Sequence, residues 1–205
     1  MVKAVVSAFP NIVLAGTFLL TWIEPSRFGP GMISSLMLLM VLEFINVHTS
    51  GLIATIMTTE ADVTKKVTRI GGFCLFATLF AGGLAIAFGT WWPLMAFWLL
   101  TVNRLLPTLL GQGSPGREHE LVTMAWVSGF VAFVLAGVLT TIVPVPELGI
   151  TKAVVQAEHL PGEGTWVNEP QRVMAAGVLY FSAVALMQLN SYAWLMKLRD
   201  RGATA

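Results

Sequence analysis

Two ionisable side chains of opposite charge, Glu43 and Arg104, lie near the middle of long apolar stretches. A charge at bilayer depth costs roughly 3 kcal/mol on insertion scales, so it tends to face a partner or a water-filled cavity. Each lies eleven residues after the predicted start of its helix, Met32 or Pro93. At about 1.5 Å per residue, both are predicted about 16 Å from the same membrane surface. This pair is the first candidate for binding or proton transfer.

More polar side chains share the second predicted helix. Asn46 follows Glu43 by three residues and is expected on the same face, whereas His48 follows by five and points elsewhere. Glu43 and His48 are therefore not expected to form a local metal pair. A histidine could still relay protons, because small environmental shifts carry its pKa across neutrality.

Two other apolar stretches carry polar groups at depth. In one, Asn103 and Arg104 precede Pro107, which lacks an amide hydrogen and crowds the carbonyl of Asn103, so we predict a kink there. The other carries Gln188 and Asn190. Broken helices at membrane depth often line binding cavities, although proline is also frequent in membrane helices without that role. We predict a polar core made of these residues together with Glu43, Asn46 and His48. The structural alternative is a dry ion pair between Glu43 and Arg104 that only fixes helix register.

The rest of the sequence is that of an all-α membrane protein. Hydrophobic residues make up 56% of the chain and charged residues 11%, and the mean hydropathy is +0.76, far from an ordinary soluble domain. About 20 apolar residues span a bilayer. We predict a polytopic bundle of six transmembrane helices in one domain, residues 1–205, with the helices at about 4–23, 32–57, 70–90, 93–111, 121–143 and 172–196. The long outer loop is predicted at 144–171, either as a binding loop or as a cap on the bundle.

The basic residues set the predicted orientation. Under six crossings, eight of the twelve fall on one side and three on the other, while Arg104 lies within the membrane. The side richer in lysine and arginine is usually cytoplasmic. We expect both termini to be cytoplasmic, in the inner (cytoplasmic) membrane of a cell.

Small residues at four-residue spacing predict close helix packing. Ala77, Ala81, Ala85 and Gly89 form one such series, and a ridge of this kind lets a neighbouring helix approach closely. The helix that carries it is predicted to be scaffold rather than site.

Several functions lack their usual signatures. His119 and His159 both fall in predicted loops, so a bis-histidine haem is not expected, and HExxH, GxSxG and P-loop motifs are absent from the sequence. No basic face for nucleic acid is present. We therefore expect no metal, cofactor or nucleic-acid partner and assign no catalytic residue.

Three functional hypotheses remain open. The first is a small transport or channel-like protein whose polar core binds or gates a small polar solute, an ion or a proton. The second is a non-catalytic, accessory subunit of a larger membrane complex, and the third is an intramembrane enzyme, which the lack of a visible nucleophile disfavours. The lipid bilayer is the expected partner, with a homo-oligomer or a larger membrane complex also possible.

Overall fold

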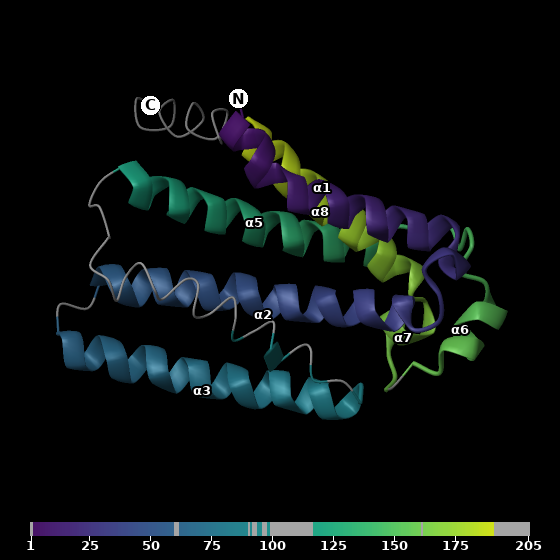
Figure 1. Ribbon diagram of the computed structural model, residues 1–205, viewed down its shortest axis with the longest axis horizontal. Coiled ribbons are helices and arrows are strands. Elements are labelled where there is room, and N and C mark those ends of the chain that lie inside the picture. The colour runs from purple at the N-terminus through teal and green to yellow at the C-terminus, as the bar shows by residue number, and fades with distance from the viewer. Residues whose placement is uncertain are drawn as a thin grey trace. The chain divides into compact units, whose positions relative to one another are not determined.

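The computed structural model describes residues 2–59, 62–89, 91, 94–95, 98, 117–160 and 162–190. Within these ranges the protein is all-helical, with no strand. The elements in chain order are α1 Val2–Ile23, the 3-10 helix η1 Pro25–Phe28, α2 Met32–Thr59, α3 Val63–Ala87, α5 Arg117–Ile142, α6 Lys152–Glu158, α7 Thr165–Asn168 and α8 Gln171–Leu189 (Figure 1).

Five of these helices are long and apolar enough to cross a membrane, by length and composition. Their candidate spans are Ala4–Ile23, Met32–Thr49, Thr64–Ala87, Met124–Ile142 and Gln171–Leu189. This fits the predicted helical membrane protein. The remaining predicted helix, 93–111, lies almost wholly outside the described residues, so a sixth span and the orientation of the termini stay predictions.

The chain divides into two compact units. Unit 1 comprises Met1–Met37 with Val127–Ala205, and unit 2 comprises Leu38–Trp126. The prediction of one domain over residues 1–205 stays a prediction.

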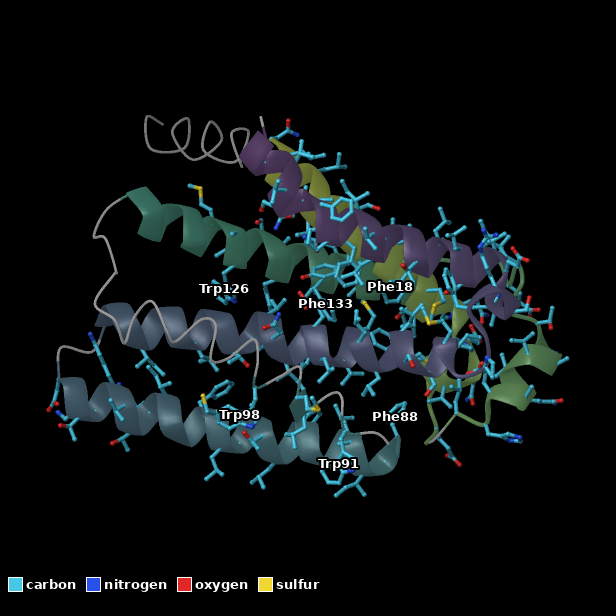
Figure 2. All side chains as sticks on the ribbon, in the orientation of Figure 1. Phe18, Phe88, Trp91, Trp98, Trp126 and Phe133 are labelled. Atoms are coloured by element: carbon cyan, nitrogen blue, oxygen red, sulfur yellow. The ribbon has the colours of Figure 1, made fainter. Side chains whose placement is uncertain are left out.

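Unit 1 is built on an antiparallel pair of helices, α1 and α8, with the second half of α5 beside them (Figure 1). The core between α1 and α8 contains Phe18, which is fully buried and lies 5.5 Å from Phe181, ring centre to ring centre (Figure 2). Tyr180 reaches α5 through an edge-on contact with Phe133 at 5.3 Å. Aromatic pairs at such distances stabilise a fold beyond the area they bury.

The connection between α5 and α8 folds over the end of α1. Trp22 donates its indole N–H to the carbonyl of Pro146 at 2.9 Å and accepts a hydrogen bond from the amide of Gly149 at 3.0 Å. A Cβ at Gly149 would lie 2.2 Å from the carbonyl oxygen of Ile23, so only glycine permits this approach. The predicted outer loop, 144–171, thus contains α6 and α7 and forms a cap over the end of α1 in unit 1.

Unit 2 is centred on a pairing of α2 with α3. Ile45 packs against Ala77 and Ala81, which are buried to 1% and 0% exposure. Ala85 is also buried, which confirms the predicted ridge of small residues at three of its four positions. The fourth, Gly89, lies beyond the end of α3 with a positive φ of 62°.

The start of α3 differs from the prediction. The helix begins at Val63, seven residues before the predicted boundary at 70. Its N-cap is Asp62, whose carboxylate accepts hydrogen bonds from the amides of Thr64 and Lys65 at 2.8 and 3.4 Å. An N-cap satisfies amides that have no partner within the helix. The charged residues 65–69 are therefore helical.

Candidate functional site

The polar residues of α2 lie on two nearly opposite faces of the helix. Asn46 donates its side-chain amide to the carboxylate of Glu43 at 3.2 Å, and both side chains are half-buried. This confirms that the two share a face. The pair sits about 16 Å along a helix of 28 residues, which is about 42 Å long. A carboxylate is thus held inside an apolar helix by an amide one turn away.

His48 lies on nearly the opposite face of α2. Its Nδ1 is 2.7 Å from the carbonyl oxygen of Phe44, and its ring packs on the Phe44 ring at 4.1 Å. Because a carbonyl oxygen only accepts hydrogen bonds, Nδ1 must carry the hydrogen in this contact. In the neutral ring the second nitrogen, Nε2, is then the one that can take up a proton.

Three predicted site residues cannot be placed. Asn103, Arg104 and Pro107 all lie outside the described residues, so neither the ion pair of Arg104 with Glu43 nor the kink at Pro107 is tested. Their assignment to a polar core stays a prediction.

Gln188 makes a contact that the sequence analysis does not anticipate. It accepts a hydrogen bond from the side-chain amide of Asn11 in α1 at 2.9 Å. Gln188 belongs to unit 1, whereas Glu43, Asn46 and His48 belong to unit 2. The structure therefore assigns Gln188 a role in joining α1 to α8. The only available signal was an amide side chain, Asn11, within the first apolar stretch.

Asn190 lies at the end of a helix. It is the C-cap of α8, it is exposed, and its side-chain amide donates to the carbonyl of Leu186 at 3.2 Å. The sequence analysis predicted a helix that continued to 196, with Asn190 within it. The structure ends α8 at Leu189, and residues from 191 onward lie outside the described ranges.

The chain has no recognisable relative in three comparisons: no protein-family model, no curated protein and no solved structure matches it. Only the geometry of the candidate site therefore bears on its function. Within the described residues, no group of three or more histidine, cysteine, aspartate or glutamate side chains is arranged to hold a metal ion.

Unit 2 also contains an aromatic contact on α2 close to the polar residues. Trp126 of α5 donates its indole N–H to the carbonyl of Val47 at 2.8 Å (Figure 2). The indole ring occupies the place of a side chain at Gly51, where a Cβ would lie 2.0 Å from it. This contact fixes α5 against the stretch of α2 that carries Asn46 and His48, so the polar residues are held on a positioned helix.

A second polar cluster caps helix ends in unit 1. Arg172 donates through Nη1 to the carbonyls of Thr140, Thr141 and Val143 at 2.6, 3.1 and 3.3 Å, and through Nε to the carboxylate of Glu169. The last carbonyls of a helix have no partner within it, and a cation there also interacts favourably with the helix dipole. Arg172, which the sequence analysis counted only as an outer charge, thus ties the start of α8 to the end of α5.

Proposed function

We propose that this protein is a small transport or channel-like protein of the inner membrane, with both termini cytoplasmic, that binds or gates a small polar solute, an ion or a proton. The observation that carries the proposal is the hydrogen-bonded pair of Glu43 and Asn46 at mid-length in the apolar helix α2. Ionisable groups at such depth mark ion paths and proton relays in many membrane proteins.

The chemistry of the pair supports this role. A carboxylate has two oxygens and about four acceptor sites, and the amide of Asn46 occupies one of them. A carboxylate can coordinate a cation or take up a proton. His48, five residues further along α2 and on nearly the opposite face, carries the hydrogen on Nδ1 and supplies a second polar group in the same apolar helix.

The decisive experiment is a flux measurement on the full chain in lipid vesicles. A pH-sensitive dye inside the vesicles reports proton entry when a potassium gradient with valinomycin drives it. Radiolabelled sodium or swelling in small polar solutes reports the other substrates. We expect the wild-type protein to accelerate at least one of these fluxes and Glu43→Gln to abolish the acceleration. Glu24→Gln, which changes an exposed carboxylate paired with Arg27, should leave it intact.

Water access to the pair is a separate test. In a Cys74→Ala background, a cysteine introduced by Asn46→Cys should react with a water-soluble maleimide. One introduced by Ala81→Cys, at a position with 0% exposure in the contact between α2 and α3, should not. Wild-type vesicles that behave like protein-free vesicles for every solute, together with an unreactive Asn46→Cys, would overturn the proposal.

A second candidate function is supported by unit 1. There the polar side chains of Asn11, Gln188 and Arg172 are engaged in helix-to-helix contacts. This favours a non-catalytic subunit of a larger membrane complex, in which polar residues fix helix register. The exposed apolar side chains of α3, among them Leu75, Phe76 and Leu79, then face a partner helix or lipid. A stoichiometric partner that co-purifies after cross-linking in the native membrane, with no flux in vesicles, would support this function over transport.

A further inference from the structure

A pocket of about 550 Å³ opens in unit 1 between the cap over the end of α1 and the start of α8. This volume is within the range of small-molecule sites, about 300–1,000 Å³. The wall has an apolar part, with the buried Ile150 and the half-buried Val155. Its polar part includes two carboxylates, two cationic side chains and three amides. The pocket is separate from the polar residues of α2.

One wall residue points to a ligand. Gln171, the first residue of α8, lines the pocket and is only 7% exposed. Within the described part of the chain, its side-chain amide makes no hydrogen bond. Its amide atoms are not fully enclosed, so an amide that lines the pocket can form a hydrogen bond with a ligand that enters it. The pocket is where a partner for Gln171 can enter.

Arg172 also lines this pocket. Its Nε and Nη1 atoms are occupied by Glu169 and by the carbonyls at the end of α5. Its Nη2 makes no hydrogen bond to any residue that the structure describes. Because the other two nitrogens hold the guanidinium plane in place, the Nη2 donors are oriented before an anion arrives, and little rotamer entropy is lost on binding.

The two remaining charges in the wall have opposite signs. Lys152 and Glu147 line the pocket, and the ion pairs among the described residues, Arg27–Glu24 and Arg172–Glu169, involve neither of them. Glu169, in contrast, already pairs with Arg172. The pocket therefore offers an anion two cationic groups, Lys152 and the Nη2 edge of Arg172, and offers a cation the carboxylate of Glu147. A ligand with charge of only one sign would leave either the cationic groups or the carboxylate of Glu147 without a partner in the ligand.

We propose that this pocket binds a small zwitterion, in which an ammonium group and a phosphate or carboxylate are separated by a few atoms. The anionic group lies against Lys152, Arg172 and the amide of Gln171, and the ammonium group lies against Glu147. Two sources supply this chemistry: a free solute of the amino-acid type, or the headgroup of an aminophospholipid.

The position of the pocket is compatible with both sources. It lies where α5 ends and α8 begins, at the same end of unit 1 as the C-terminus of α1, which the cap contacts through Trp22 (Figure 1). The ends of membrane helices, where tryptophan is enriched, lie at the level of the lipid headgroups. A pocket at this level is open to the aqueous phase and to the lipid surface.

The test uses the full chain in two settings. In phosphatidylcholine nanodiscs, calorimetry measures binding of O-phosphoethanolamine and of glycine. Ethanolamine and inorganic phosphate are the controls, because each carries charge of only one sign. In vesicles that contain phosphatidylethanolamine, native mass spectrometry measures how much of that lipid stays bound after extraction. We expect one zwitterion to bind, and ethanolamine and inorganic phosphate each to bind at least about tenfold more weakly than that zwitterion.

Three variants identify the site. Gln171→Leu and Lys152→Gln should each weaken binding about tenfold or more, and Lys65→Gln, an exposed lysine of α3 in unit 2, should not. Lys152 is exposed, so its variant tests the site even if Gln171→Leu fails to fold. Binding of free O-phosphoethanolamine or glycine without lipid retention identifies a solute, and the reverse identifies a lipid headgroup. No zwitterion bound in either setting, or binding that both pocket variants leave unchanged, overturns the proposal.

Discussion

Asn11 and Gln188 form a side-chain hydrogen bond of 2.9 Å that joins the first and last described helices of the chain. Two turns away along both helices, Phe18 packs on Phe181. The spacing between the two contacts is seven residues in α1 and seven in α8, which is the repeat at which two helices keep the same faces together. One polar and one aromatic contact therefore fix the antiparallel register of this pair.

The first prediction concerns that hydrogen bond. Asn11→Leu and Gln188→Leu should each lower the free energy of unfolding by about 0.6 to 1.7 kcal/mol, the range measured for hydrogen bonds between membrane helices. Each single change also leaves the other amide half-buried without this partner. The double variant removes both amides and should recover most of the loss. Unfolding of all four proteins by SDS titration gives the coupling energy, and strictly additive losses would show that the two amides do not interact.

The second prediction concerns the close approach of α1 to α8 at Gly177. A Cβ there would lie 2.3 Å from the ring of Phe18. Gly177→Ala should therefore destabilise the protein by about 1–3 kcal/mol, as overpacking does in other cores. Gly16→Ala in α1, where no atom lies within 4 Å of the added methyl group, should be neutral or slightly stabilising.

A compensating change separates the clash from other effects of Gly177→Ala. Phe18→Leu removes the ring that the new methyl group meets, so the double variant should lose less stability than the sum of the two single changes. Thermal unfolding in detergent measures all four proteins. Equal stability of Gly177→Ala and Gly16→Ala would contradict the close approach.

The third prediction concerns the cap that Arg172 forms on α5. Arg172→Gln should lower the free energy of unfolding by about 1.5–3 kcal/mol, because hydrogen bonds from a charged donor to three carbonyls are lost. Arg172→Lys keeps the charge but not the planar guanidinium group, so its free energy of unfolding should lie between those of the wild type and Arg172→Gln. The matched control is Arg27→Gln, at an exposed arginine that pairs with Glu24, which should change stability by less than about 1 kcal/mol. Similar losses for both arginines, measured by SDS titration, would refute the capping role.

The apolar helices could be predicted because their signal is local. Stretches of about 20 apolar residues identified five spans, and four-residue spacing identified the buried ridge of Ala77, Ala81 and Ala85. The face shared by Glu43 and Asn46 followed from helix geometry alone. The start of α3 was missed because its capping residue, Asp62, lies in a charged segment that does not count towards an apolar span.

The contacts between helices could not be predicted, because they join residues far apart in the sequence. Asn11 and Gln188 are 177 positions apart, and Trp22 and Pro146 are 124 apart. Nothing in the local sequence of one partner identifies the other. The pocket next to Gln171 is formed by the same cap. Its charged residues are brought together only by the tertiary fold, so the sequence alone does not group them.

The last prediction concerns Thr21 in α1, which is fully buried and whose hydroxyl has no hydrogen-bond partner among the described residues. An unsatisfied buried polar group costs about 1–3 kcal/mol. Thr21→Val replaces the hydroxyl with a methyl group of similar size and should raise the free energy of unfolding by about 1 kcal/mol. The matched control is Thr49→Val in α2, which is also buried but donates its hydroxyl to the carbonyl of Ile45 at 2.6 Å. That change removes a satisfied hydrogen bond and should be neutral or destabilising. Thermal unfolding of the two variants in the same detergent compares them directly. A loss of stability in Thr21→Val equal to that in Thr49→Val would mean that the Thr21 hydroxyl has a partner in the folded protein.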